Sequence, residues 1–84
     1  LPLTSPHEPV APSAGFRGKS GLNPLADFLI ETDAVVGRVV AAVDELGLGK
    51  NTLVVFTADN GSSLYTGGAE LKQLGHEPSA GWRG

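Results

Sequence analysis

Thr52-Leu53-Val54-Val55-Phe56-Thr57 is a run of strand length in which apolar and β-branched residues follow one another. Such runs are typical of strands buried on both faces of a parallel sheet. The first residues, Leu1-Pro2-Leu3-Thr4, read like the end of an earlier strand. We therefore expect an α/β fold: a fragment of a mostly parallel sheet covered by helices, in which this chain forms a β-loop-α-β unit with an irregular C-terminal segment.

Between the two expected strands, the sequence predicts a long loop and then a long helix. Pro and Gly recur too often from Ser5 to Asn23 for a regular element. Asn23-Pro24 is a strong helix start, and Gly47 is a typical stop. One helix face is apolar and is expected to pack against the sheet; it consists of Leu25, Phe28, Leu29, Val35, Val36, Val39, Val40, Val43 and Leu46.

Length and composition limit the function classes. The chain has 84 residues, a net charge of -3 and no cysteine, so no disulfide can stabilise its small core. Its six Lys and Arg residues are scattered, which argues against a nucleic-acid partner. No apolar run is long enough to predict a membrane span. Two strands and one helix cannot cover both faces of a sheet, so we expect a fragment that folds only marginally alone.

Two groups of polar residues follow the expected strands. In parallel sheets, ligands bind beyond the carboxyl ends of the strands, so His7 and the pair Asp59-Asn60 are expected at one sheet edge. A carboxylate and an amide oxygen suit Ca²⁺ or Mg²⁺. The alternatives are an ordinary turn for Asp59-Asn60-Gly61 and an exposed loop histidine for His7. No serine has a visible base partner, so a Ser-His-Asp hydrolase is not supported.

The order of these segments resembles the sulfatase family (arylsulfatase type) of the alkaline-phosphatase-like superfamily. The most specific string is Asn51 to Gly61, which contains the expected strand and ends in Thr57-Ala58-Asp59-Asn60-Gly61. The other matching segments are Ser5-Pro6-His7-Glu8-Pro9, Phe16-Arg17-Gly18-Lys19-Ser20, Glu31-Thr32-Asp33, Val36-Gly37, Gly75-His76-Glu77-Pro78-Ser79 and Gly81-Trp82-Arg83-Gly84. The resemblance implies that residues 1–84 are a partial sulfatase catalytic domain from its later part.

The resemblance also implies roles for individual residues. Asp59 and Asn60 would bind a divalent cation, calcium rather than magnesium, that holds a sulfate oxygen. His7 would act on the sulfate ester as catalytic and substrate-binding residue, and His76 would lie near the substrate. The family's nucleophile is a formylglycine made from Cys or Ser in a Cys/Ser-x-Pro-x-Arg motif. This sequence contains no such motif, so the nucleophile would come from the remainder of the catalytic domain.

We therefore expect part of a sulfuric ester hydrolase whose isolated fragment is inactive. Two alternatives stay open: a phosphate or phosphonate ester hydrolase of the same superfamily, and a non-catalytic remnant or interaction module. The resemblance further implies a periplasmic, secreted or lysosomal location.

Overall fold

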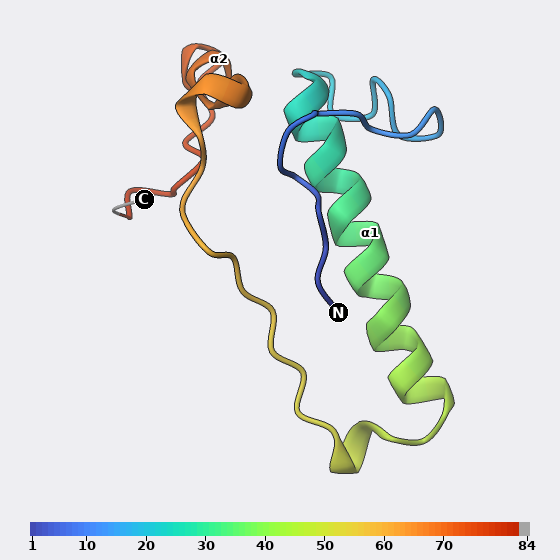
Figure 1. Cartoon of the computed structure of the whole chain (residues 1–84). Helices are drawn as coiled ribbons and strands as arrows, with labels where there is room; N and C mark the ends of the chain where they lie inside the picture. Colours follow the sequence, from blue (N-terminus) through green and yellow to red (C-terminus); the bar gives the residue numbers. More distant parts are fainter. Residues whose placement is uncertain (83–84) are drawn as a thin grey trace.

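A single long helix organises the chain. In the computed structural model, which describes residues 1–82, this helix is α1 (Pro24–Glu45), 22 residues long (Figure 1). It begins as predicted: Asn23 is extended, its Oδ1 accepts a hydrogen bond from the Ala26 amide at 2.9 Å, and Pro24 occupies the first turn. It also ends as predicted, because Gly47 follows the last turn with φ 68°.

The remaining elements are short. After α1 come a 3-10 turn, η1 (Gly49–Asn51), and an extended segment, followed by a π-helical turn, η2 (Leu64–Gly68), and the helix α2 (Ala69–Gln73). The extended segment runs back from the far end of α1, so that η2 and α2 lie near its beginning (Figure 1). The C-terminal quarter is therefore partly helical, and its prediction as an irregular segment is wrong. Arg83 and Gly84, the last two residues of the segment Gly81-Trp82-Arg83-Gly84, lie outside the described residues.

A small core joins the two ends of the chain. Leu25 and Ala26 in the first turn of α1 pack with Leu71 of α2, and Val10 of the N-terminal loop packs against them. Leu71 is only 1% exposed. Burying a leucine side chain contributes about 1.5–3 kcal/mol, so this cluster is a substantial link for a chain of this size.

Asp27 holds the loop of residues 13–22 against the start of α1. Its two carboxylate oxygens accept hydrogen bonds from the Gly18 amide (2.7 Å), the Ser20 amide (2.8 Å) and the Ser20 hydroxyl (2.6 Å). The side chain is buried, although Asp27 does not belong to the predicted apolar face of the helix. Its position in the first helical turn also favours a negative charge.

These bonds make the loop sensitive to acid. The Ser20 hydroxyl, followed by the Ser20 and Gly18 amides, lowers the pKa of Asp27 below its ordinary value because all three stabilise the carboxylate. A carboxyl with a lower pKa in the folded state stabilises the protein above its unfolded pKa, and this contribution is lost as the pH falls through the folded pKa. The loss is therefore expected below about pH 4.

We expect Asp27→Asn to destabilise the protein at neutral pH, and the difference from the unchanged protein to shrink as the pH falls below about 4. Denaturant unfolding between pH 3 and 7 measures it. Asp33→Asn is the matched control, because Asp33 is an exposed residue of the same helix and its substitution removes the same charge. A difference between the unchanged protein and Asp27→Asn that did not vary with pH would contradict the assigned role of the carboxylate.

The predicted α/β fold is wrong for the chain as the structure describes it. Within residues 1–82 no segment forms a β-strand, so the expected β-loop-α-β unit and parallel sheet do not form. Residues 52–57 are extended but unpaired, and Leu53 and Val55 are 88% and 74% exposed. The reason is physical: a strand exists only when its N–H and C=O groups pair with a neighbour, and apolar β-branched composition alone cannot supply one.

The apolar face of α1 is present, but the packing predicted for it is not. Leu25 is buried, whereas Val39 and Val40 are each 39% exposed and Leu46 is 72% exposed.

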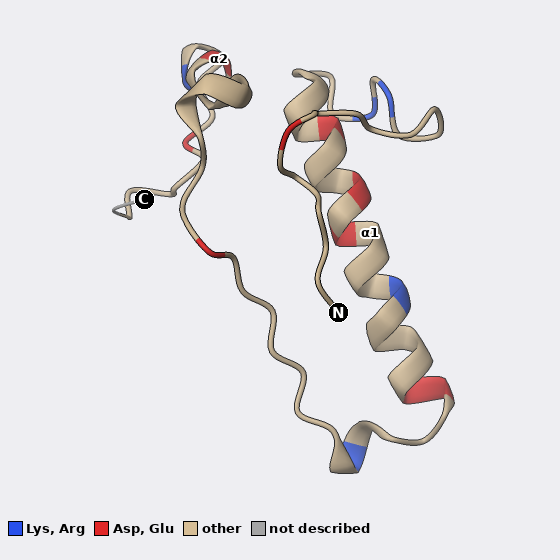
Figure 2. Cartoon of the chain, viewed as in Figure 1, with Lys and Arg blue, Asp and Glu red and all other residues tan. Residues whose placement is uncertain are grey.

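No helix in the described chain is long and apolar enough to cross a membrane. Five of the nine Asp and Glu residues lie on α1, whereas the Lys and Arg residues of the described chain are spread over loops and helices (Figure 2).

Candidate active site

His7 lies on an N-terminal arm that is fastened to α1. The His7 amide donates to the Thr4 carbonyl at 3.0 Å, which closes a turn around the histidine. Two residues before His7, the Ser5 hydroxyl oxygen lies 2.9 Å from Oγ1 of Thr32, a buried residue of α1. The turn and this contact fix the part of the backbone from which the imidazole projects.

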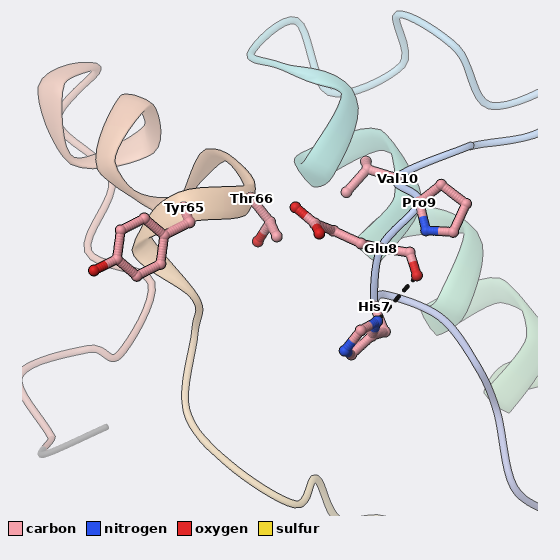
Figure 3. Close-up of a pocket in the computed structure, with 6 residues that line it drawn as sticks. All are labelled: His7, Glu8, Pro9, Val10, Tyr65 and Thr66. Carbon is pink, nitrogen blue, oxygen red and sulfur yellow. Dashed lines mark hydrogen bonds between the residues drawn. The ribbon is translucent and has the colours of Figure 1, made fainter.

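One ring nitrogen of His7 is engaged and the other is available. Nδ1 lies 3.0 Å from the carbonyl oxygen of Glu8. A carbonyl can only accept a hydrogen bond, so Nδ1 carries the proton in this arrangement. Figure 3 shows the second ring nitrogen pointing away from this contact. Nε2 is therefore the atom of His7 that can accept, donate or transfer a proton to a ligand.

His7 lines an open groove between the arm and η2. Figure 3 shows its two walls: His7 to Val10 on one side, and Tyr65 and Thr66 on the other. The groove has a volume of about 750 Å³, within the range of small-molecule sites. Its lining combines the His7 imidazole, the Glu8 carboxylate and the Thr66 hydroxyl, so it can hydrogen-bond a polar ligand, whereas the Tyr65 ring is 98% exposed and points away from His7 (Figure 3).

The sequence gives no local signal for the second wall. Tyr65 and Thr66 are 58 and 59 positions after His7 by residue number, in a segment rich in glycine and serine that was predicted to be irregular. They lie opposite the arm because Leu71 packs with the beginning of α1 and Asn23 hydrogen-bonds to Gly67 and Glu70. Glu8, in contrast, follows His7 directly and could have been named beside it.

Asp59 and Asn60 lie on exposed backbone before η2, outside this groove. The predicted sheet edge that would bring them beside His7 does not form. Asn60 Nδ2 donates to the Gly61 carbonyl at 2.7 Å, which leaves its Oδ1 as the oxygen that can bind a cation. A carboxylate and an amide oxygen fit a hard divalent cation, but calcium takes about six to eight oxygen ligands. These two residues therefore fit as part of a cation site.

Further acidic or histidine ligands do not gather around this pair. Among residues 1–82, no group of three or more His, Cys, Asp or Glu side chains is placed to hold a metal. His76 follows α2, where its amide donates to the Leu71 carbonyl at 2.9 Å, and it does not line the groove of His7. The role predicted for His76 stays a prediction.

A family model and individual proteins similar in sequence to this chain all point to sulfatases. The sequence model of the family described as Sulfatase matches residues 1–83. The chain is 36% identical over 81 residues to N-acetylgalactosamine-6-O-sulfatase of Bacteroides thetaiotaomicron, covering 93% of this chain and 16% of that protein. It is 47% identical over 55 residues to human arylsulfatase A, covering 66% and 11%, respectively.

The whole chain aligns with human arylsulfatase D, at 33% identity over 84 residues and 13% of that protein. The chain thus spans at most 16% of the length of these three relatives. No solved structure matches the chain significantly.

Proposed function

The chain belongs to the sulfatase family, and from this premise we propose that the whole protein hydrolyses sulfate esters. The observation that carries the proposal is the match of the sulfatase family to residues 1–83, a range that contains His7, Asp59 and Asn60. Because the chain is a small share of its relatives' length, the reaction is a property of the whole protein. This chain contributes one acid-base group and part of a cation site.

His7 is the residue we propose to act on the ester. Its Nε2 is free of the contact that engages Nδ1, and the ring borders a groove large enough for a small molecule. A protonated imidazole there can donate a hydrogen bond to a sulfate oxygen or a proton to the departing alcohol oxygen. Both actions stabilise the negative charge that develops as the sulfur-oxygen bond breaks.

Asp59 and Asn60 are the residues we propose as cation ligands, through a carboxylate oxygen and Asn60 Oδ1. The cation is Ca²⁺ in this proposal, and when bound it supplies positive charge that offsets the charge of the sulfate group. The nucleophile, a formylglycine, and the other ligands belong to the rest of the whole protein. By the same family argument we propose a periplasmic, secreted or lysosomal location.

Paired substrates test the proposal. We expect the purified whole protein to release sulfate from an aryl sulfate in the presence of Ca²⁺, and to hydrolyse the matched aryl phosphate more slowly. The 84-residue chain alone is the control and is expected to show no turnover, because it contains no Cys/Ser-x-Pro-x-Arg motif. Faster phosphate release would favour a phosphate ester hydrolase, and the absence of both activities would favour a non-catalytic protein.

A further inference from the structure

Asn23 joins two segments that are far apart in the sequence. Its amide Nδ2 donates to the Gly67 carbonyl and to Glu70 Oε2, both at 3.1 Å, while Oδ1 accepts from the Ala26 amide. The side chain is 6% exposed. Its orientation follows from its partners, because the opposite placement of the amide would set its oxygen against the carbonyl and carboxylate oxygens. Asn23 therefore caps α1 and also ties η2 and α2 to it.

The backbone of η2 is shaped for this contact. Gly67 has φ 121°, a conformation that other residues rarely adopt. A Cβ at this position would lie 3.0 Å from Asn23 Nδ2 and 3.2 Å from Leu25 Cβ. The missing side chain thus lets η2 approach the beginning of α1 closely enough for the Gly67 carbonyl to accept the hydrogen bond.

The residues held in this way border the groove of His7. Thr66 directly precedes Gly67, and together with Tyr65 it forms the wall opposite His7 (Figure 3). We propose that Asn23 is a positioning residue of the active site, which holds Thr66 opposite His7 so that the Thr66 side chain contacts the alcohol part of the ester. The proposal rests on sulfate ester hydrolysis as the function.

The alternative role is helix capping alone, and two substitutions separate the two roles. Asp and Ser are good N-cap residues, so Asn23→Asp and Asn23→Ser keep an acceptor for the first turn of α1. Neither keeps the amide donor. In Asn23→Asp, the new carboxylate also faces the Gly67 carbonyl and Glu70, which repels the segment. Both variants therefore remove the link while retaining the cap.

The test uses the whole protein and two sulfate esters, one with a small alcohol and one with a bulky alcohol that reaches Thr66. We expect Asn23→Asp to raise KM roughly five- to tenfold for the bulky ester, the size expected for losing one or two hydrogen bonds. The small ester should change by less than about twofold, with similar kcat for both. Asn51→Asp is the matched control, since Asn51 is exposed at the end of η1.

Hydrogen exchange gives a readout that does not depend on turnover. Asn23→Asp should speed amide exchange in residues 62–71 while the capped start of α1, residues 24–34, stays protected. If the unchanged protein released no sulfate from either ester, the proposed function would fail, and exchange would still decide whether Asn23 holds this segment. Unchanged exchange in residues 62–71 would overturn the link itself.

A compensating substitution completes the test. In the double variant Asn23→Asp with Glu70→Gln, the new glutamine amide can donate to the aspartate, which restores one link with reversed polarity. We expect part of the KM increase for the bulky ester to disappear. An equal fall in kcat/KM for both esters, with no rescue by Glu70→Gln, would show that Asn23 acts only through stability and would overturn the positioning role.

Discussion

Substituting His7 by Ala in the whole protein is expected to lower kcat/KM for esters of weakly acidic alcohols by about 10²–10⁴-fold, the usual contribution of a positioned acid-base group. The arm that carries His7 is fixed through Ser5 and Thr32, so its position does not depend on the imidazole. Nδ1 is engaged with the Glu8 carbonyl, and Nε2 remains for the substrate. The decrease in kcat/KM should therefore arise from a slower chemical step.

The dependence on the leaving group distinguishes proton transfer from binding. An ester of an acidic phenol needs little help from an acid, because its oxygen leaves as a stable anion. We expect the loss in His7→Ala to be much smaller for such an ester than for an alkyl ester. A series of sulfate esters with alcohols of increasing pKa measures this slope.

Two further variants sharpen the result. His7→Gln keeps a hydrogen-bond donor without a proton that can be transferred, so it should resemble Ala for alkyl esters. Lys50→Ala is the control for removing a polar side chain, because Lys50 is exposed in η1 and lies outside the groove. Equal losses in His7→Ala for all leaving groups would assign His7 to binding alone, and unchanged rates would remove it from the site.

Local signals predicted the helix of this chain well. The start at Asn23-Pro24 and the stop at Gly47 act through neighbouring residues, and α1 has these limits. Cap hydrogen bonds and the φ preference of glycine are decided within one turn, so a single sequence contains them.

Features that depend on distant partners were predicted poorly. The apolar composition of residues 52–57 indicates that a partner would stabilise a strand, but it does not provide one, and the segment stays unpaired. Asp27 shows the reverse case: it does not belong to the predicted apolar face, yet loop amides bury and bind it. Helical periodicity cannot reveal such a partner, because the loop has no periodic pattern of its own.

In the candidate site, too, local motifs could be recognised in the sequence, whereas contacts between distant segments could not. His7 and the Asp59-Asn60 pair were named from their motifs, and their roles stay predictions that the whole protein must test. Their expected proximity depended on a parallel sheet, which residues 1–82 do not form. The wall of Tyr65 and Thr66 follows from the Asn23 and Leu71 contacts, which the sequence alone does not pair.

The second large effect is expected at the cation ligands. In the whole protein, Asp59→Ala should weaken Ca²⁺ binding about a hundredfold or more, because affinity depends strongly on the number of charged oxygen ligands. Asp59→Asn keeps one carbonyl oxygen and removes the charge, so its affinity should be intermediate. Asn60→Ala removes a neutral oxygen and should have a smaller effect than Asp59→Ala. Calorimetric titration with Ca²⁺ measures these affinities without reference to turnover.

Glu77→Gln is the matched control for charge, because Glu77 is exposed and its substitution also removes one negative charge. Its Ca²⁺ affinity should stay close to that of the unchanged protein, since an exposed carboxylate that is not a ligand acts on the cation only through a charge that salt screens. Sulfate ester turnover should fall in the order of the measured affinities at limiting Ca²⁺ and recover in Asp59→Asn at high Ca²⁺. Recovery would show that the residue acts by holding the cation. Equal affinities for Asp59→Ala and the unchanged protein would instead mean that Asp59-Asn60-Gly61 is only a turn.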